Sequence, residues 1–178
     1  SNINTLLLVF NCELKELKSK QGDLKYVQTR QLFSFVEMKM IPSRHLAEIE
    51  SSAEKKIFSV LEKIDMPGWV CLHSVFLAEH DYQKSGEIDF LLLGPQGLLV
   101  LEIKGGRVRV DEKHIWIHTN RFGHETRRGK SPFKQAHDNM HSLINDLVVN
   151  KKEWRNLRVG YAVAFPDIVF DLESTEWT

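Results

Sequence analysis

Apolar positions recur along this chain with two different periods, which predict helices and strands. From Leu46 to Ile64 apolar residues return every three or four positions, as on one face of a helix, and Pro67-Gly68 ends the pattern. A second stripe of this kind runs from Phe133 to Leu147, behind Ser131-Pro132, a favourable helix start. We therefore expect two amphipathic helices.

Strands are predicted between the two helices and after the second one. They are Trp69 to Ala78, Phe90 to Leu93, Leu98 to Leu101 and Asn156 to Phe165. The second and third are nearly unbroken apolar runs, typical of strands buried on both faces, and Gly94-Pro95-Gln96-Gly97 joins them in a tight antiparallel hairpin. The polar segment His80 to Gly86 is predicted to be a loop, so the first three strands form a meander. A further short pair, Arg107 to Val110 and His114 to His118, is expected to extend the sheet or to form a flap.

Charged residues lie where the two strands of the hairpin meet. Antiparallel pairing brings Asp89, at the start of one strand, close to Glu102 and Lys104, at the end of the next. Glu102 and Lys104 are two residues apart and share a face, whereas Ile103 points into the opposite layer. Ionisable groups in such a place are costly to desolvate unless they serve each other or a cation.

Two carboxylates and one ammonium group have the composition of a metal-dependent phosphodiesterase site. Mg²⁺ prefers hard oxygen ligands and typically takes one or two protein carboxylates besides water and substrate phosphate. Asp89 and Glu102 fit this description. Lys104 would then orient or help to deprotonate the attacking water, or offset charge on the phosphate. The alternative is an ordinary Glu-Lys surface pair, with Asp89 as a strand-start residue.

Several spaced motifs resemble the NERD family, the nuclease-related domain of the PD-(D/E)xK or restriction-endonuclease-like superfamily. They are Glu54 in SSAEKKIFSVL, Gly86-Glu87-Ile88-Asp89, Gly97-Leu98-Leu99-Val100-Leu101-Glu102-Ile103-Lys104 and Ser131-Pro132-Phe133-Lys134-Gln135-Ala136. The match runs from about Glu48 to Asp167. It implies an α/β fold with an αβββαβ core, in which a central mixed four-stranded sheet is flanked by helices, together with Mg²⁺ dependence and DNA as substrate.

The resemblance also implies roles for individual residues. Helix geometry alone does not choose between Glu50 and Glu54 as a helix-borne carboxylate, and the family pattern selects Glu54. The same pattern assigns Gln135 to the site, although it lies in the first helical turn, away from the apolar stripe. The alternatives are a solvated glutamate and a solvent-facing glutamine. The implied catalytic set is Glu54, Asp89, Glu102, Lys104 and Gln135, and the implied metal ligands are Asp89, Glu102 and Ile103.

The charge of the chain is balanced, but its distribution is uneven. There are 24 Lys and Arg residues against 24 Asp and Glu residues, whereas nucleic-acid-binding proteins usually carry a basic surplus. Basic residues nevertheless gather between the hairpin and the second helix, at Lys104, Arg107, Arg109, Arg121, Arg127, Arg128, Lys130 and Lys134. We expect Arg107, Arg127, Arg128, Lys130 and Lys134 to bind the DNA backbone. The alternative is a solvated loop, with Arg127 to Lys130 mobile in the absence of ligand.

Other chemistry is disfavoured by the pattern of residues. Cys12 and Cys71 are far apart and form neither a disulfide scaffold nor a zinc site, which fits a reducing cytoplasm. His114 and His118 have the spacing of helical zinc ligands but lie in a strand-like segment, and His137 is expected to be packed in the core. Leu6 to Phe10 is too short to span a bilayer, so we expect no membrane association.

Composition, with 42% hydrophobic and 27% charged residues, predicts one globular core. Residues 1–40 fit the family poorly and are interpreted as an N-terminal extension, followed by a NERD-like nuclease domain at residues 41–178. Met38 or Met40 is a candidate natural start of translation. The end of the chain lacks an evident closing element, so we expect a piece of a longer protein, since NERD domains are often joined to a helicase or a kinase.

Two functional classes follow from these observations. The preferred one is a metal-dependent DNA nuclease that uses Mg²⁺, or Mn²⁺ since both accept oxygen ligands, in DNA processing or repair. A helicase domain in the same or another chain is an expected partner, as is a second copy of the chain for cutting both strands. The alternative is a module that binds nucleic acid or a partner protein with little or no catalysis.

Overall fold

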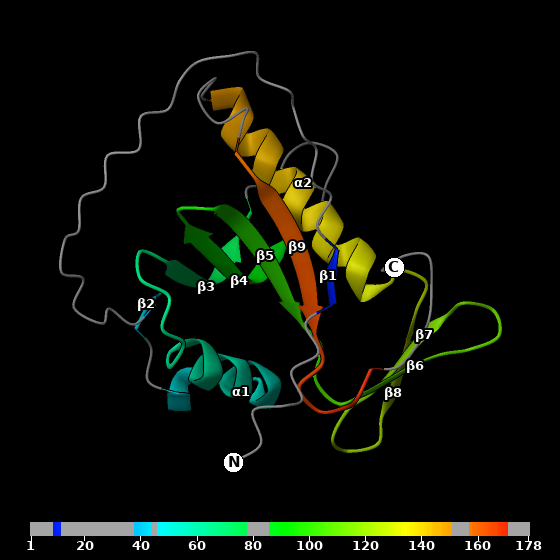
Figure 1. Ribbon diagram of the computed structural model, residues 1–178. Coiled ribbons are helices and arrows are strands. Elements are labelled where there is room, and N and C mark those ends of the chain that lie inside the picture. The colour runs from blue at the N-terminus through cyan, green and yellow to red at the C-terminus, as the bar shows by residue number, and fades with distance from the viewer. Residues whose placement is uncertain (1–8, 12–37, 44–45, 78–85, 151–156, 171–178) are drawn as a thin grey trace, which may run out of the picture.

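A six-stranded mixed sheet organises the protein. The structure, a computed structural model, describes residues 9–11, 38–43, 46–77, 86–150 and 157–170 (Figure 1). The strands are β1 (Val9–Asn11), β2 (Lys39–Ile41), β3 (Val70–Phe76), β4 (Glu87–Gly94), β5 (Gly97–Ile103) and β9 (Val159–Ala164). Their spatial order is β1-β9-β5-β4-β3-β2. The pairs β5–β9 and β2–β3 are parallel and the other neighbours are antiparallel.

The expected mixed α/β class is confirmed, but the sheet has six strands instead of four. The four predicted strands correspond to β3, β4, β5 and β9, and the first three form the expected meander. The additional strands β1 and β2 have three residues each and occupy the two edges. Short edge strands limit the exposed backbone on which another chain could pair.

The first helix is shorter than its apolar stripe predicts. Instead of one helix over 46–64, the chain forms a 3₁₀ turn at Leu46–Glu48 and then α1 (Ser52–Leu61). Ser51, in extended conformation, begins α1 by accepting a hydrogen bond on its side chain from the Glu54 N–H at 3.3 Å. A serine cap ends the helix on its N-terminal side even where the apolar stripe continues beyond it.

The second helix, α2 (Pro132–Asn150), begins where the sequence predicts. The Ser131 hydroxyl accepts a hydrogen bond from the Lys134 N–H at 3.0 Å, and proline occupies the first helical position. Farther along, the Asn139 side chain donates to the carbonyl of Glu87 at 3.0 Å. This bond ties α2 to the start of β4.

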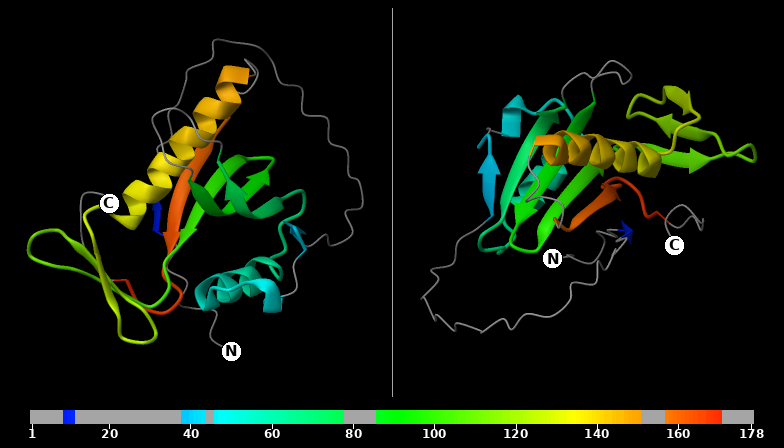
Figure 2. Two further views of the ribbon diagram at one scale, coloured as in Figure 1. Left: turned by 180° about the vertical axis from the view of Figure 1, so that it is seen from behind. Right: turned by 90° about the horizontal axis from the view of Figure 1, so that it is seen from above.

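The two helices lie apart with the strands between them (Figure 1, Figure 2). Ala53, Ile57, Phe58 and Leu61 of α1 form one buried cluster with residues of β3, β4, β5 and β9, among them Leu101 and Ile103. Met140 and Leu143 of α2 form another with Leu98 and Val100. Because successive strand residues face opposite layers, Glu102 shares the α2 face of β5 and Ile103 the α1 face, as predicted.

A separate three-stranded sheet projects at one end of the molecule (Figure 2). It comprises β6 (Arg107–Val110), β7 (Trp116–Thr119) and β8 (Glu125–Arg128), paired antiparallel. The expected pair of strands is confirmed, but it forms a sheet of its own and does not extend the main one. The alternative of a loop at Arg127 and Arg128 was wrong, because both belong to β8. Trp116 anchors this sheet by packing with Phe133 of α2 in a third buried cluster.

Parts of the predictions fall outside the described residues. These are most of the His80–Gly86 loop, the start of the last predicted strand at Asn156, the segment from 171 onward, and Cys12. The loop after β3 is closed by a hydrogen bond from the Leu77 N–H to the Gly86 carbonyl, 2.9 Å. Strand β2 crosses the domain boundary expected between residues 40 and 41. Met38 and Met40 are buried in the α1-side cluster, the cluster that contains the buried residues of α1. Neither α1 nor α2, in its described part, is long and apolar enough to pass through a membrane.

Candidate active site

The β4–β5 hairpin brings the predicted carboxylates together. Phe90 pairs with Leu101 and Gly94 with Gly97, so Asp89 lies opposite Glu102 at the open end of the hairpin. Asp89 Oδ2 accepts a hydrogen bond from the Ile103 main-chain N–H at 2.6 Å. This bond holds the Asp89 carboxylate against β5, as the hairpin argument predicts.

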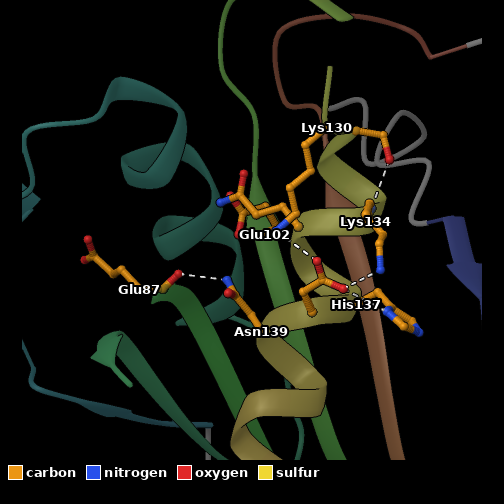
Figure 3. Close-up of polar contacts among 9 residues, drawn as sticks. Glu87, Glu102, Lys130, Lys134, His137 and Asn139 are labelled. Carbon is orange, nitrogen blue, oxygen red and sulfur yellow. Dashed lines mark hydrogen bonds and ion pairs between the residues drawn. The ribbon is translucent and has the colours of Figure 1, made fainter. Parts of the chain in front are cut away.

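Glu102 is the most deeply buried charged residue among those described, with 1% of its surface exposed. Its Oε1 accepts hydrogen bonds from Lys104 Nζ at 2.5 Å and from Gln135 Nε2 at 2.6 Å. Its Oε2 is buried and has no hydrogen-bond partner among the described residues. Figure 3 shows Glu102 on β5 beside the first turns of α2. Gln135 therefore reaches the sheet from the first turn of α2, although it lies off the apolar stripe.

Burial makes both carboxyl groups resist ionisation. Desolvation, and next the charge of Glu102, raise the pKa of Asp89 from 3.8 to about 7, despite the Ile103 hydrogen bond and the Lys104 ammonium. Desolvation also raises the pKa of Glu102, which Lys104 only partly opposes. Among the described residues Lys104 is the cation paired with this centre, and its single charge does not compensate both carboxylates. The site can therefore accommodate more positive charge.

Glu54 reaches the same region from α1. Its Oε2 lies 2.9 Å from Nε2 of His73, a β3 residue with 4% exposure whose ring packs against Phe58 and Phe90. Glu50 lies before α1 and is exposed, which distinguishes the two glutamates that helix periodicity left open. Sequence reasoning missed His73, although a polar residue at an inward position of a predicted strand is a usable signal.

The segment after Lys104 is tied closely to α1. A Cβ atom on Gly105 would lie 2.6 Å from the Ala53 Cβ, so only glycine fits this approach. The Gly106 N–H donates to Asp167 Oδ2 at 2.7 Å, and Asp167 also pairs with Lys56 of α1. Asp167, which no sequence motif singles out, thus fixes the exit of β5 beside the helix.

The donor set fits a hard divalent cation through Asp89 and Glu102. Within the described ranges, no group of three or more His, Cys, Asp or Glu residues is arranged to hold a metal ion. One or two protein carboxylates are the usual complement for Mg²⁺. Glu102 Oε2, which has no hydrogen-bond partner among the described residues, is an oxygen ligand of the kind that such an ion prefers. The Ile103 side chain is buried in the α1-side cluster and offers no ligand. Only its main-chain carbonyl has an oxygen to contribute.

The basic residues expected to bind DNA separate into two groups. Arg127 lies 3.6 Å from Asp111, and Lys130 and Lys134 lie 2.9 and 2.6 Å from the two Asp138 oxygens. Arg107 and Arg128 have no carboxylate partner in the part of the chain that the structure describes. Figure 3 shows Lys130 and Lys134 at the N-terminal end of α2.

The remaining histidine and cysteine predictions have mixed outcomes. His137 is not a core residue, because 35% of its side chain is exposed and it contacts Asp138 and His141. Burial, and then the charges of Lys104 and Arg128, lower the pKa of His118. Cys71 is a free thiol whose pKa burial raises to about 12.

Comparison with known families agrees with the motifs. The family model NERD, described as nuclease-related domain, matches residues 49–166, which contain every predicted catalytic residue. No curated protein and no solved structure matches the chain.

Proposed function

Because this chain belongs to the nuclease-related domain family, we propose that it is a metal-dependent nuclease that hydrolyses phosphodiester bonds of DNA. The observation that carries the proposal is the pair of carboxylates on half-buried Asp89 and buried Glu102. These carboxylates are held together by the hairpin, and one buried Glu102 oxygen lacks a partner among the described residues. A structural role alone gives no reason to bury two like charges so close together.

Asp89 and Glu102 would hold the metal ion, with the Ile103 carbonyl as a further candidate ligand. When bound, Mg²⁺ or Mn²⁺ supplies Lewis-acid polarisation of the phosphate and lowers the pKa of a coordinated water. Both ions accept oxygen ligands, so the carboxylate set supports either one.

The other polar residues position the reactants. Lys104, now hydrogen-bonded to Glu102, would orient the attacking water or offset charge on the phosphate. Gln135 would fix Glu102 and the substrate from the start of α2, and Glu54 would supply an outer carboxylate. In hydrolysis the water oxygen bonds to phosphorus, the bond from phosphorus to the leaving sugar oxygen breaks, and that oxygen takes up a proton.

The arrangement of the core supports the same proposal. The order of its main elements is α1, β3, β4, β5, α2 and β9, with the β6–β8 sheet inserted before α2. We assign this order to the restriction-endonuclease-like αβββαβ core. The edge strands β1 and β2 and the small sheet are additions to it.

The deciding experiment is a cleavage assay on labelled single- and double-stranded DNA with Mg²⁺, Mn²⁺ or EDTA. The wild-type protein is expected to cut DNA in a metal-dependent manner, and Asp89→Ala and Lys104→Ala should abolish cutting. Lys63→Ala, an exposed lysine beyond α1, serves as the control and should retain wild-type activity. Cutting that survives in EDTA or in Asp89→Ala would contradict the proposal.

A binding module with little or no catalysis is the second candidate. It is favoured by the finding that no group of three metal-binding side chains occurs in the described part of the chain. DNA retention without cutting in any metal would select it. The preferred proposal also includes two partners in the cytoplasm, a second copy of the chain and a helicase domain. Sedimentation with duplex DNA would test the second copy, and co-purification would test the helicase.

A further inference from the structure

A small basic pocket lies beside the carboxylate centre. Its volume is about 140 Å³, room for a group of a few heavy atoms, since a water molecule takes about 30 Å³ in the liquid. It is lined by Lys104, His118, Thr126, Arg128, Lys130, Pro132 and Gln135. Three distant parts of the chain therefore meet there: the exit of β5, the β7–β8 pair and the start of α2.

The lining selects for an anion. It contains three cationic side chains and no carboxylate. Lys130 shares Asp138 with Lys134, and Arg128 has no carboxylate partner among the described residues. The N-terminal end of α2 contributes further positive potential. Thr126 adds a hydroxyl donor.

The pocket and the carboxylate centre share a wall. Lys104 and Gln135 line the pocket, and both donate to the same oxygen of Glu102, at 2.5 and 2.6 Å. An anion in the pocket is thus separated from Glu102 by one layer of side chains. In a nucleic-acid strand, the nearest anionic group to a reacting phosphate is the neighbouring phosphate.

We infer that this pocket binds an internal phosphate of the DNA strand, adjacent to the one that is cleaved, through Arg128, Lys130 and Thr126. The inference rests on the proposed function and makes it specific. Thr126 and Arg128 are two residues apart on β8 and share a face with His118, the partner of Thr126. Arg127 points to the other face, where it pairs with Asp111. The inference therefore removes Arg127, which pairs with Asp111 on the other face, from the residues expected to bind the DNA backbone.

Adjacent arginines on β8 provide a matched test. Binding of a fluorescently labelled single-stranded oligonucleotide is measured in EDTA, so that no cleavage intervenes. Arg128→Gln is expected to raise the Kd about tenfold, the loss of one charge-assisted contact, and to reduce the salt dependence by about one phosphate contact. Arg127→Gln removes the same charge from the opposite face and should change the Kd less than about twofold. Arg128→Lys should recover part of the affinity.

A second variant and a second ligand sharpen the result. Thr126→Val should weaken binding without any change in charge, which gives a test that survives if Arg128→Gln does not fold. An oligonucleotide with a 5′-phosphate should bind no more tightly than one without it. If the wild type prefers the 5′-phosphorylated oligonucleotide and Arg128→Gln removes that preference, the pocket binds a terminal phosphate. That result would overturn the inference of an internal phosphate.

Failure of the pocket and failure of the nuclease have different signatures. If Arg127→Gln and Arg128→Gln lose equal DNA affinity, or if neither loses any, the pocket is overturned. The nuclease would survive that result if the wild type cuts DNA and Arg128→Gln cuts it with an unchanged KM. Conversely, a wild type that never cuts, but whose binding depends on Arg128 and not on Arg127, would retain the pocket and remove the nuclease.

Discussion

Two pairs of carboxylates among the described residues have opposite electrostatics. Burial opposes ionisation of Asp138 and Asp167, but hydrogen bonds from neighbouring lysines and other donors outweigh it and lower both pKa values. Burial dominates at Asp89 and Glu102, where it raises the pKa. The first group stabilises the fold when ionised, whereas the second group destabilises it when ionised. Carboxyl groups whose pKa is raised by burial are typical of functional sites.

The raised pKa of Asp89 predicts that the contribution of this residue to the stability of the metal-free protein falls as the pH rises. In the unfolded chain Asp89 ionises near its ordinary value of 3.8, but in the folded protein only near 7. The folded state therefore binds more protons between these values, and its stability falls from about pH 4 to about pH 7. A pKa difference of one corresponds to about 1.4 kcal/mol, so the total is up to roughly 4 kcal/mol.

Asp89→Asn isolates this contribution, because the amide oxygen can still accept the Ile103 hydrogen bond. In urea unfolding with EDTA, the variant should be more stable than the wild type at pH 8 and similar at pH 4, while its metal-dependent activity is lost. A stability difference between wild type and variant that does not change between pH 5 and pH 8, or a variant that is less stable than the wild type at pH 8, would contradict the assignment.

His73 is predicted to position Glu54. Its ring is buried and its Nε2 lies 2.9 Å from the Glu54 carboxylate. His73→Phe keeps the aromatic packing but removes this partner, so we expect kcat to fall about tenfold with little change in KM, and a stability loss of about 1–2 kcal/mol. His73→Gln, which retains a donor, should recover part of kcat. Equal effects of the two variants would assign His73 to packing alone.

At the residue level, the closeness of two side chains was predictable where a single local motif brings them together. The turn Gly94 to Gly97 fixes the register of the hairpin, so Asp89 and Glu102 had to meet. Their contacts with α1 and α2 were not predictable in this way. The Glu54–His73 and Gln135–Glu102 contacts depend on how separate elements pack, and helix periodicity even directed attention away from Gln135.

Among the elements, helix starts carry particular weight, because each helix presents a site residue near its first turn. The Ser131 cap of α2 is buried, and its hydroxyl accepts from the Lys134 N–H at 3.0 Å, one residue before Gln135. Ser131→Ala should lower the free energy of unfolding by about 1–2 kcal/mol and reduce activity by displacing Gln135. Chemical denaturation and the cleavage assay measure the two effects.

The cap of α1 provides the comparison for this prediction. Ser51 accepts a longer bond, 3.3 Å, at a less buried position. Ser51→Ala should therefore cost less, about 0.5 kcal/mol. A larger loss for Ser51→Ala than for Ser131→Ala would show that cap burial does not set the ranking.

The elements that the sequence predicted well are those with a strong period and clear ends. The hairpin and α2 have both. The stripe at 46–64 extends past its cap, so the pattern overestimated α1. Strand β8 was missed because Glu125-Thr126-Arg127-Arg128 has no apolar residue. Its pairing with β7, which Trp116 anchors to α2, supplies the stability that its own composition lacks.

For the whole molecule, the site is a junction between layers that only the folded chain assembles. Glu54 comes from α1, Asp89 and Glu102 from the sheet, and Gln135 from α2. The formal charge is zero, yet the carboxylates and the basic pocket lie side by side and are separated by Lys104 and Gln135. Acidic and basic groups are thus segregated at the place where a metal ion and a phosphate are proposed to meet.

This arrangement predicts that a divalent metal binds the folded state and stabilises it. Occupancy at ten times the Kd would add about 1.4 kcal/mol, or a rise in Tm of about 3–6 °C for a chain of this size. We expect this rise with Mg²⁺ at pH 8 relative to EDTA at matched ionic strength, and a smaller rise at pH 5, where protons compete for Asp89 and Glu102. Asp89→Asn should show no rise at either pH. Calorimetric melting is independent of catalysis, so an equal rise in wild type and variant would remove the metal from this site even if the protein cuts DNA.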